Sequence, residues 1–295
     1  MPNPRMAEKD YLECAILDKL FQDSYINDNF VFAGGGSITK SYNISPRICQ
    51  DLDLSCADFA DIPNDRSKKQ LYHFKKDFKK FVFEVLKAKI NYIINQNQQF
   101  MIATDRDWHA LENKEQFMSS PTLHLLYKSA FGPEMGHICI EVIPRVYQPS
   151  AIEHRSVVPY STKTPMGDIP TVSYEQTFWD KIYALHSNTQ SEKPHSTQFY
   201  SRHYYDVAQI APYVDLYKTK HMLRVIANHQ KKYTTREISP FIGPRDISLI
   251  PDNETANKLD NDYQEMSRAT FYSAPEEWST IMQRLRMLNQ KLKTL

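Results

Sequence analysis

The sequence predicts an α/β (α+β) protein in two parts, in which strands and helices alternate first and a mainly helical C-terminal domain follows. Short apolar runs that fit strands lie between residues 29 and 143, whereas helical periodicity dominates after Pro170. The length of 295 residues also favours two domains, because single domains typically span about 100–200 residues. A proline-containing stretch separates the two patterns, so we expect domains at 1–155 and 156–295.

Each element is expected from its own local pattern of apolar residues. In chain order, the first part should hold a helix at 8–22, a strand at 29–33, a helix at 38–42, a strand at 51–55, a long basic helix at 65–96, and strands at 100–103, 122–131 and 137–143. The second part should hold helices at 174–186, 199–213, 216–230, 255–266 and 276–293. Ser37 is placed to cap the short helix that follows the first strand.

Composition excludes several classes of protein. Hydrophobic residues make up 41% and charged residues 24% of the chain, which is typical of globular proteins and not of collagen-like or disordered ones. Lys and Arg number 36 against 35 Asp and Glu, so any affinity for nucleic acid must come from a local patch. The chain contains no long uncharged apolar run and its first twenty residues are charged, so we expect a cytoplasmic protein with no membrane segment. The four cysteines form no CxxC pair and are too scattered in sequence for a zinc site.

The glycines are few and clustered. The chain has only seven, yet Gly34, Gly35 and Gly36 are consecutive, between a predicted strand and a predicted helix. Such a turn lets backbone amides approach a phosphate at a helix N-terminus, and Ser37 would supply a hydroxyl. The alternative is an ordinary tight turn, which is less attractive for three glycines in a glycine-poor chain.

Three acidic residues are candidate metal ligands. Asp51 and Asp53 are two apart on a predicted strand, so their carboxylates point to the same face and can share a hard cation such as Mg²⁺. Glu141 lies within an apolar strand, where an ionised carboxylate is costly unless it is paired or bound to a metal. If the two strands are neighbours, the three carboxylates converge. A buried salt bridge at Glu141 and a solvated strand face at Asp51 and Asp53 are the alternatives.

The helical part offers three further candidates. Lys181 falls on the apolar stripe of its predicted helix, where its ammonium either enters a cleft or extends to solvent. Arg202 and Asp206 are four apart on the next helix and share a face, which is usually a surface ion pair.

Taken together, these features resemble the AbiEii-like nucleotidyltransferase toxins, which include the MenT-type enzymes and belong to the DNA polymerase β-like superfamily. The matching segments are Glu8-Lys9-Asp10-Tyr11, Phe32-Ala33-Gly34-Gly35-Gly36-Ser37-Ile38, Arg47, Asp51-Leu52-Asp53-Leu54, Ile140-Glu141-Val142, Thr177-Phe178-Trp179-Asp180-Lys181, Ala184-Leu185-His186, Arg202-His203-Tyr204-Tyr205-Asp206, Leu249-Ile250-Pro251 and Asp262-Tyr263. The commonest turn of that family has Thr in place of Gly36 and Leu in place of Ile38. The joint order of these segments, over nearly the whole chain, carries the resemblance.

The resemblance implies an N-terminal nucleotidyltransferase fold with a mixed sheet, and an active-site cleft completed by the helical domain. Roles in nucleotide binding would then fall to Gly34, Gly35, Ser37, Lys181 and Arg202. Metal binding would fall to Asp51, Asp53 and Glu141, with Lys181 and Asp206 completing the catalytic group. The implied cofactor is Mg²⁺, with Mn²⁺ as a substitute, and the implied substrate is an NTP.

An RNA acceptor, the 3′ end of tRNA in particular, is implied by the same resemblance, as is an antitoxin partner encoded nearby. Basic residues that would meet an RNA backbone are Lys75, Lys76, Lys79, Lys80, Lys231 and Lys232, although charged runs are more often simply solvated. Two alternatives remain open on the residues alone. One is transfer to a protein or small-molecule hydroxyl, and the other is a catalytically silent fold that only binds.

Overall fold

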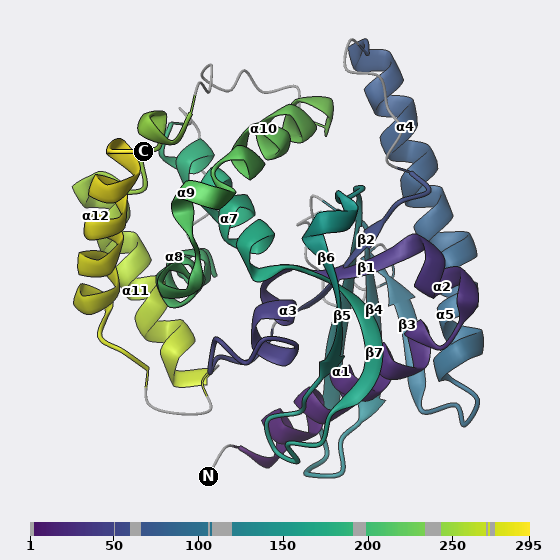
Figure 1. Ribbon diagram of the computed structural model, residues 1–295. Coiled ribbons are helices and arrows are strands. Elements are labelled where there is room, and N and C mark those ends of the chain that lie inside the picture. Colours follow the sequence, from purple (N-terminus) through teal and green to yellow (C-terminus); the bar gives the residue numbers. More distant parts are fainter. Residues whose placement is uncertain are drawn as a thin grey trace. The chain divides into compact units, whose positions relative to one another are not determined.

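Two units of different secondary structure make up the chain (Figure 1). The computed structural model describes residues 3–49, 51–59, 66–105, 107, 120–190, 199–233, 243–269, 271 and 275–295. The first unit comprises Met1–Asn43 and Ile48–Val172, and the second comprises Ile44–Arg47 and Ser173–Leu295. The sequence prediction places the boundary after residue 155, whereas the two units divide after Val172.

A mixed sheet forms the centre of the first unit. In the described residues its strands are β1 (Phe30–Ala33), β2 (Asp51–Cys56), β3 (Phe100–Thr104), β4 (Thr122–Lys128), β5 (Met135–Pro144), β6 (Ile152–Val157) and β7 (Met166–Val172). Their order is β3-β4-β5-β2-β1-β7-β6. The pairs β2/β5 and β1/β7 are parallel, and the other neighbours are antiparallel. The predicted α+β class with a mixed sheet is confirmed.

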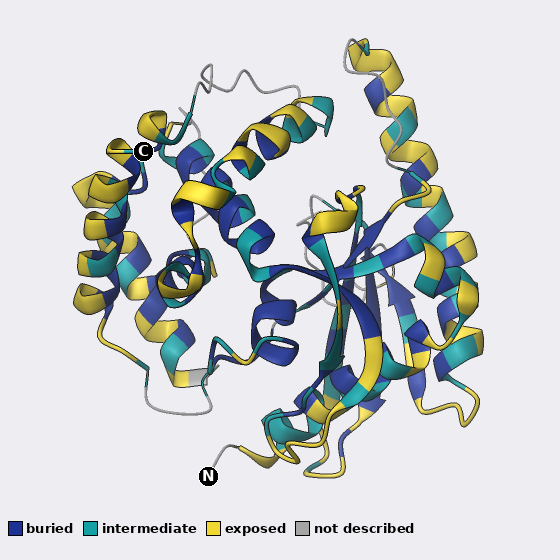
Figure 2. Ribbon diagram, in the orientation of Figure 1, coloured by how far each residue is buried: buried dark blue, intermediate teal, exposed yellow. Residues whose placement is uncertain are grey.

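The first unit also contains helices, of which α1 (Pro4–Phe21) and α5 (Lys87–Ile94) contribute buried side chains to the core on the apolar face of the sheet. The other described helices are α2 (Ser24–Asn29), α3 (Gly34–Lys40), α4 (Lys68–Lys80) and the π-helical η1 (Phe81–Leu86), with a 3₁₀ turn, η2 (Pro149–Ala151), before β6. The predicted basic helix is thus the continuous run α4–η1–α5. From Phe78 onward, its buried side chains recur every four residues, at Phe78, Val82, Leu86, Ile90 and Ile94. The outer half of α4 is largely exposed (Figure 2).

The two faces of the sheet differ in chemistry, and this difference positions the candidate site. Alternate residues of the central strands, such as Leu52, Leu54 and Ile140, are fully buried in the core that α1 and α5 cover. On the opposite face, Asp51 and Asp53 of β2 and His137, Cys139 and Glu141 of β5 are half-buried. Strand β5 was expected to be apolar on both faces, but only its even-numbered residues enter the core.

Two local expectations are wrong. The proline-containing stretch expected to separate the two domains instead forms the β6–β7 hairpin, and β7 adds to the sheet beside β1. The weak alternation of β6 and Pro170 within β7 conceal a strand pattern, because proline is normally excluded from central strands. The helix after the glycine turn begins at Gly34 and not at Ile38, with Ala33 as its N-cap, so Ser37 lies inside the helix and does not cap it.

The second unit is helical, as predicted. Its elements are α7 (Tyr174–Thr189), α8 (Ser201–Ile210), η3 (Ala211–Tyr213), α9 (Leu216–Thr219), α10 (His221–Tyr233), η4 (Pro244–Asp246), α11 (Asn253–Ala269) and α12 (Trp278–Lys293). Aromatic side chains form much of its interior, with Tyr204 against Trp278 and Tyr205 against Tyr263. These contacts bring α8, α11 and α12 together around buried rings.

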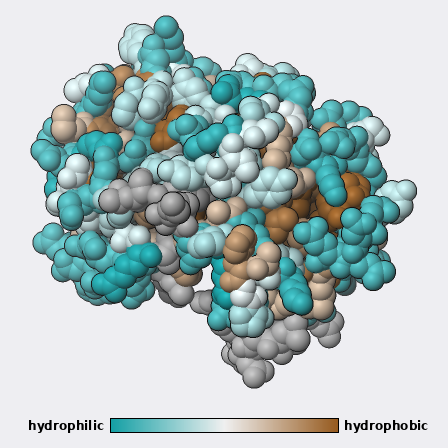
Figure 3. Space-filling model, turned by 90° about the horizontal axis from the view of Figure 1, so that it is seen from below, coloured by the Kyte–Doolittle hydropathy of each residue, from teal (hydrophilic) through white to brown (hydrophobic). Residues whose placement is uncertain are grey.

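Hydrophobic residues on the face shown in Figure 3 occur in small groups among hydrophilic ones. In the described part of the chain, no helix combines the length and the apolar character needed to cross a bilayer.

Candidate active site

Three carboxylates meet on the polar face of the sheet, where β2 and β5 run parallel. Asp53 lies directly opposite Glu141 in the register, and Asp51 is two residues away on the same face of β2. One oxygen from each of the three side chains lies within 4.8 Å of the other two. All three residues are half-buried. The three carboxylates were expected to converge only if the two strands were neighbours. In the structure the strands are neighbours and the carboxylates do converge.

The donor set of this carboxylate triad (Asp51, Asp53 and Glu141) fits a hard divalent cation. Negative charges held this close repel one another, and a cation among them relieves that repulsion. Carboxylate oxygens are the ligands preferred by Mg²⁺, which typically keeps several waters and binds substrate phosphates as well. On the chemistry of its donors, the triad therefore suits Mg²⁺ or Mn²⁺ and no soft metal.

Gly34 links the glycine turn to the triad. Its φ of +70° belongs to the left-handed region, and a Cβ placed there would lie 1.7 Å from Asp53 Oδ2. No other residue fits, because a side chain would both strain the backbone and displace the carboxylate. The turn and the acidic strand are thus packed directly against each other.

Gly36 explains the departure from the commonest family turn. A Cβ at this position would lie 2.8 Å from Cys49 Sγ and 3.0 Å from the ring of Phe32. The space that Thr would occupy is filled by these two neighbours. Ser37 is fully buried, and its hydroxyl donates a hydrogen bond to Gly34 O at 2.9 Å.

A second charged cluster lies inside the helical unit. Asp206, on α8, accepts hydrogen bonds from Arg47 Nε at its Oδ1 and from Arg47 Nη2 at its Oδ2, both at 2.7 Å. Lys181 Nζ, from α7, lies 2.9 Å from Asp206 Oδ2 and 3.4 Å from His203 Nδ1. Asp206 is 0% exposed and Lys181 is 7% exposed. Asp206 therefore pairs with Arg47 and Lys181 in the interior of the unit and not at its surface.

Burial and charge determine the protonation of this cluster. Burial alone would raise the pKa of Asp206, but Arg47 and Lys181 outweigh it and hold the pKa well below its usual range. Burial lowers the pKa of His203 well below its ordinary value, and the neighbouring Lys181 and Arg202 lower it further. Asp206 is thus ionised and His203 neutral at neutral pH, which orients Lys181 between a carboxylate and a ring nitrogen.

The remaining candidates lie on exposed or half-buried helix surfaces. Arg202 is half-buried at the start of α8. On α4, Lys75, Lys76 and Lys80 are exposed, while Lys79 is half-buried with its Nζ 5.1 Å from the centre of the Phe83 ring. Lys231 is exposed and Lys232 half-buried at the end of α10.

Sequence reasoning missed the partner of Asp206. Arg47 is 159 positions away, and it was noted only as a match to the family pattern. The only feature of the sequence that marks Arg47 is its position between two apolar segments. Many surface arginines share that position, so it does not predict a buried ion pair.

The arrangement is that of a nucleotidyltransferase. A strand leads through a glycine turn into a helix, the next strand carries paired acidic residues, and a neighbouring parallel strand carries a third carboxylate. The chain matches the family described as nucleotidyl transferase AbiEii toxin, type IV toxin–antitoxin system, over residues 15–284. It belongs to this family, and it is therefore a nucleotidyltransferase enzyme of the toxin type.

Solved structures agree at the level of the fold. The crystal structure of JHP933 from Helicobacter pylori superposes with a TM-score of 0.51 at 12% identity, covering 99% of this chain and 93% of that one. A second crystal structure of a Helicobacter pylori protein gives the same TM-score and identity, covering 99% of this chain and 96% of the other. Comparison with curated proteins gives no match.

Proposed function

We propose that this toxin transfers a nucleoside monophosphate from an NTP to an RNA acceptor, with the 3′ end of tRNA as the foremost candidate. The observation that supports this most strongly is the carboxylate triad, which offers three oxygens to one cation beside the glycine turn. Family membership supplies the reaction class. The toxin type also points to an antitoxin partner that restrains the activity.

Asp51, Asp53 and Glu141 would hold Mg²⁺, and the ion would neutralise charge on the triphosphate. In the proposed reaction, an acceptor hydroxyl attacks the α-phosphorus. The bond between the α-phosphorus and the oxygen that bridges it to the β-phosphorus breaks, and pyrophosphate leaves. Asp53 or Glu141 accepts the proton of the attacking hydroxyl.

The glycine turn and the helical unit supply the remaining groups. Backbone amides of Gly34 and Gly35 contact phosphate oxygens, as the resemblance implies. The buried hydroxyl of Ser37 donates to Gly34 O, so Ser37 supports the turn and does not itself contact phosphate. Lys181 supplies positive charge to the triphosphate, and Arg202 contacts the nucleotide. Asp206 acts as a positioning residue, because both of its oxygens already hold Arg47 and Lys181.

The test uses purified full-length protein with total tRNA, Mg²⁺ and each α-labelled NTP in turn. We expect label on RNA with one nucleotide, lost in Asp53→Asn and retained in Asp168→Asn, which changes an exposed carboxylate of β7. Label on protein, or on a small molecule, would replace the RNA acceptor. Neither transfer nor NTP binding by the folded wild type would contradict the proposal and favour a silent binding fold.

The basic surface of α4 tests the acceptor separately. Lys75→Glu, Lys76→Glu and Lys80→Glu together should raise KM for RNA and flatten its salt dependence, because each phosphate contact contributes about one unit to the logarithmic salt slope. NTP binding should be unchanged. Lys218→Glu, an exposed charge reversal on α9, is the matched control. Unaltered RNA kinetics in the triple variant would remove α4 from the acceptor surface.

A further inference from the structure

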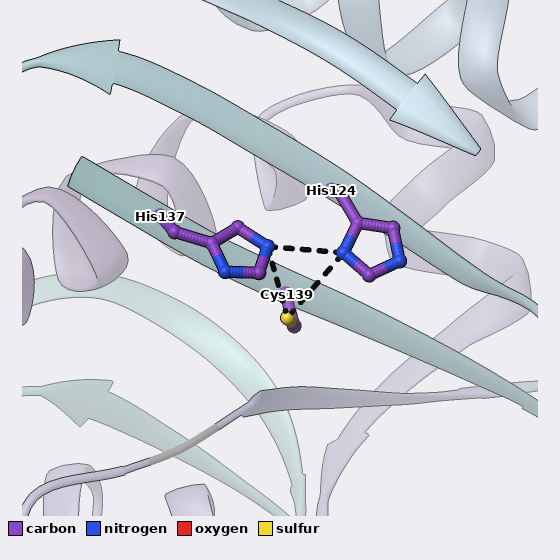
Figure 4. Close-up of side chains that lie close together, drawn as sticks. All are labelled: His124, His137 and Cys139. Atoms are coloured by element: carbon purple, nitrogen blue, oxygen red, sulfur yellow. Dashed lines mark hydrogen bonds between the residues drawn. The ribbon is translucent and has the colours of Figure 1, made fainter. Parts of the chain in front are cut away.

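A second group of metal-ligating side chains lies on the same face of the sheet as the carboxylate triad. His124, on β4, lies opposite Cys139 of β5 in the register, and His137 is two residues before Cys139. Figure 4 shows the two rings and the sulfur turned toward one another. We call these three residues the His–Cys cluster.

The distances within the cluster are those of ligands around one ion. His124 Nδ1 and His137 Nε2 are 3.0 Å apart, and Cys139 Sγ lies 3.4 Å from His137 Nε2 and 3.8 Å from His124 Nδ1. Around tetrahedral zinc, with Zn–N of about 2.0–2.1 Å and Zn–S of about 2.3 Å, two nitrogens are separated by about 3.3 Å and a nitrogen and a sulfur by about 3.6 Å. Side-chain adjustments of a few tenths of an ångström would bring the three atoms to these separations.

A carboxylate sets the tautomer of the central histidine. His124 Nε2 lies 3.1 Å from Asp105 Oδ1, while the other oxygen of Asp105 accepts a hydrogen bond from Thr122 N at 3.2 Å. Because a carboxylate oxygen only accepts, His124 carries its proton on Nε2 and presents the Nδ1 lone pair to the cluster. A histidine whose far nitrogen donates to a carboxylate is the usual arrangement in zinc sites. His124 and Asp105 are 2% and 1% exposed, which holds this arrangement in place.

We propose that His124, His137 and Cys139 bind a zinc ion, which ties β4 to β5 beside the carboxylate triad. Cys139 binds as the thiolate and releases its proton to solvent, and both histidines bind as neutral imidazoles. Three protein ligands leave the fourth tetrahedral position to water or another ligand. The nitrogen and sulfur donors select zinc, whereas the neighbouring oxygen donors select magnesium.

The site lies next to the triad without sharing a residue with it. Cys139 is two residues before Glu141 on the same face of β5, and it is the register partner of Asp51. An ion that fixes β4 against β5 would therefore hold the strand that carries Glu141. This inference stands on its own donors and does not depend on the proposed transfer reaction.

The test uses Co²⁺ as a spectroscopic probe in the full-length protein, after chelation and dialysis. We expect one tightly bound equivalent, a thiolate-to-cobalt charge-transfer band in the near ultraviolet, and loss of that band on addition of one equivalent of Zn²⁺. Cys139→Ser and His137→Gln should both abolish the band, and circular dichroism establishes that each variant is folded. His137 is half-buried, so its replacement perturbs the fold least. Cys56→Ser and His154→Gln are the matched controls and should retain the band.

Further variants separate this site from the carboxylate triad. Asp51→Asn should leave the thiolate band intact, and Asp105→Asn should weaken zinc affinity by about 10–100-fold. Cobalt binding without a thiolate band, lost in Asp51→Asn, would assign the ion to the triad and overturn the proposal. A folded wild type that binds no stoichiometric cobalt or zinc would also overturn it.

Discussion

At the residue scale, Gly34 fixes the position of a proposed metal ligand. We expect Gly34→Ala to abolish nucleotide transfer and to lower the free energy of unfolding, because a left-handed alanine costs about 1–2 kcal/mol before any clash with Asp53 is counted. Urea unfolding and the labelled-NTP assay measure the two effects. Gly243→Ala is the control, because a Cβ there meets no atom within 4 Å. Full activity in Gly34→Ala would show that the turn does not hold Asp53.

His203 makes the stability of the helical unit sensitive to acid. The pKa of His203 is lower in the folded than in the unfolded protein, so protonation favours unfolding. The contribution of neutral His203 to the free energy of unfolding is therefore complete above the unfolded-state pKa and is lost as pH falls below about 6.5. Asp206, whose pKa is also depressed, adds a further loss below about pH 4. We expect His203→Asn to reduce the decline in unfolding free energy between pH 6.5 and 4, with the exposed His154→Asn as control. An unchanged slope in His203→Asn would contradict a His203 that is neutral in the folded protein.

At the scale of elements, a buried ion cluster joins α1 to α3. Lys40 Nζ lies 2.5 Å from Asp10 Oδ1 and 2.8 Å from Glu13 Oε2, and all three side chains are at most 2% exposed. Burial lowers the pKa of Lys40, but the two carboxylates outweigh this effect and hold the pKa well above its ordinary value. Asp10 also accepts a hydrogen bond from Tyr160 N at 2.6 Å, which ties the loop between β6 and β7 to α1.

Removing the cation alone should therefore be costly. We expect Lys40→Met to lower the unfolding free energy by about 3–5 kcal/mol, since it leaves two carboxylates buried without their partner. Adding Glu13→Gln should recover part of this loss, because one buried charge disappears. Lys258→Met, which breaks an exposed pair with Glu254, should leave the unfolding free energy close to that of the wild type, because exposed ion pairs contribute little. A double variant less stable than Lys40→Met would contradict the ionic account.

At the scale of the whole molecule, local patterns predicted most elements but few long-range partners. The alternation in Asp51–Ser55 and the helical stripe from Phe78 onward depend on neighbours in sequence, and both predictions agree with the structure. The pairing of Arg47 with Asp206 and of Lys40 with Asp10 depends on how distant segments pack. The periodicity of apolar residues along the chain does not reveal which distant residues pair.

The His–Cys cluster illustrates the same difference between local and long-range information. The four cysteines form no CxxC pair, so their spacing alone predicts no zinc site. The structure instead brings two histidines and one cysteine together across the β4/β5 register. A histidine two residues before Cys139 on one strand was visible in the sequence, but the register that adds His124 was not. The carboxylate triad was easier to anticipate, because the resemblance named Glu141 together with Asp51 and Asp53.

Glu141→Gln tests the central claim most directly. Label transfer from the NTP to its acceptor would be compared for the wild type, Glu141→Gln, Asp53→Asn and Asp168→Asn, with thermal unfolding as a check on each fold. The account predicts that Glu141→Gln and Asp53→Asn each lower kcat/KM by at least about 100-fold, or about 2.7 kcal/mol of transition-state stabilisation, while Asp168→Asn matches the wild type. Wild-type transfer by a folded Glu141→Gln variant would contradict the claim that the three carboxylates act as one site.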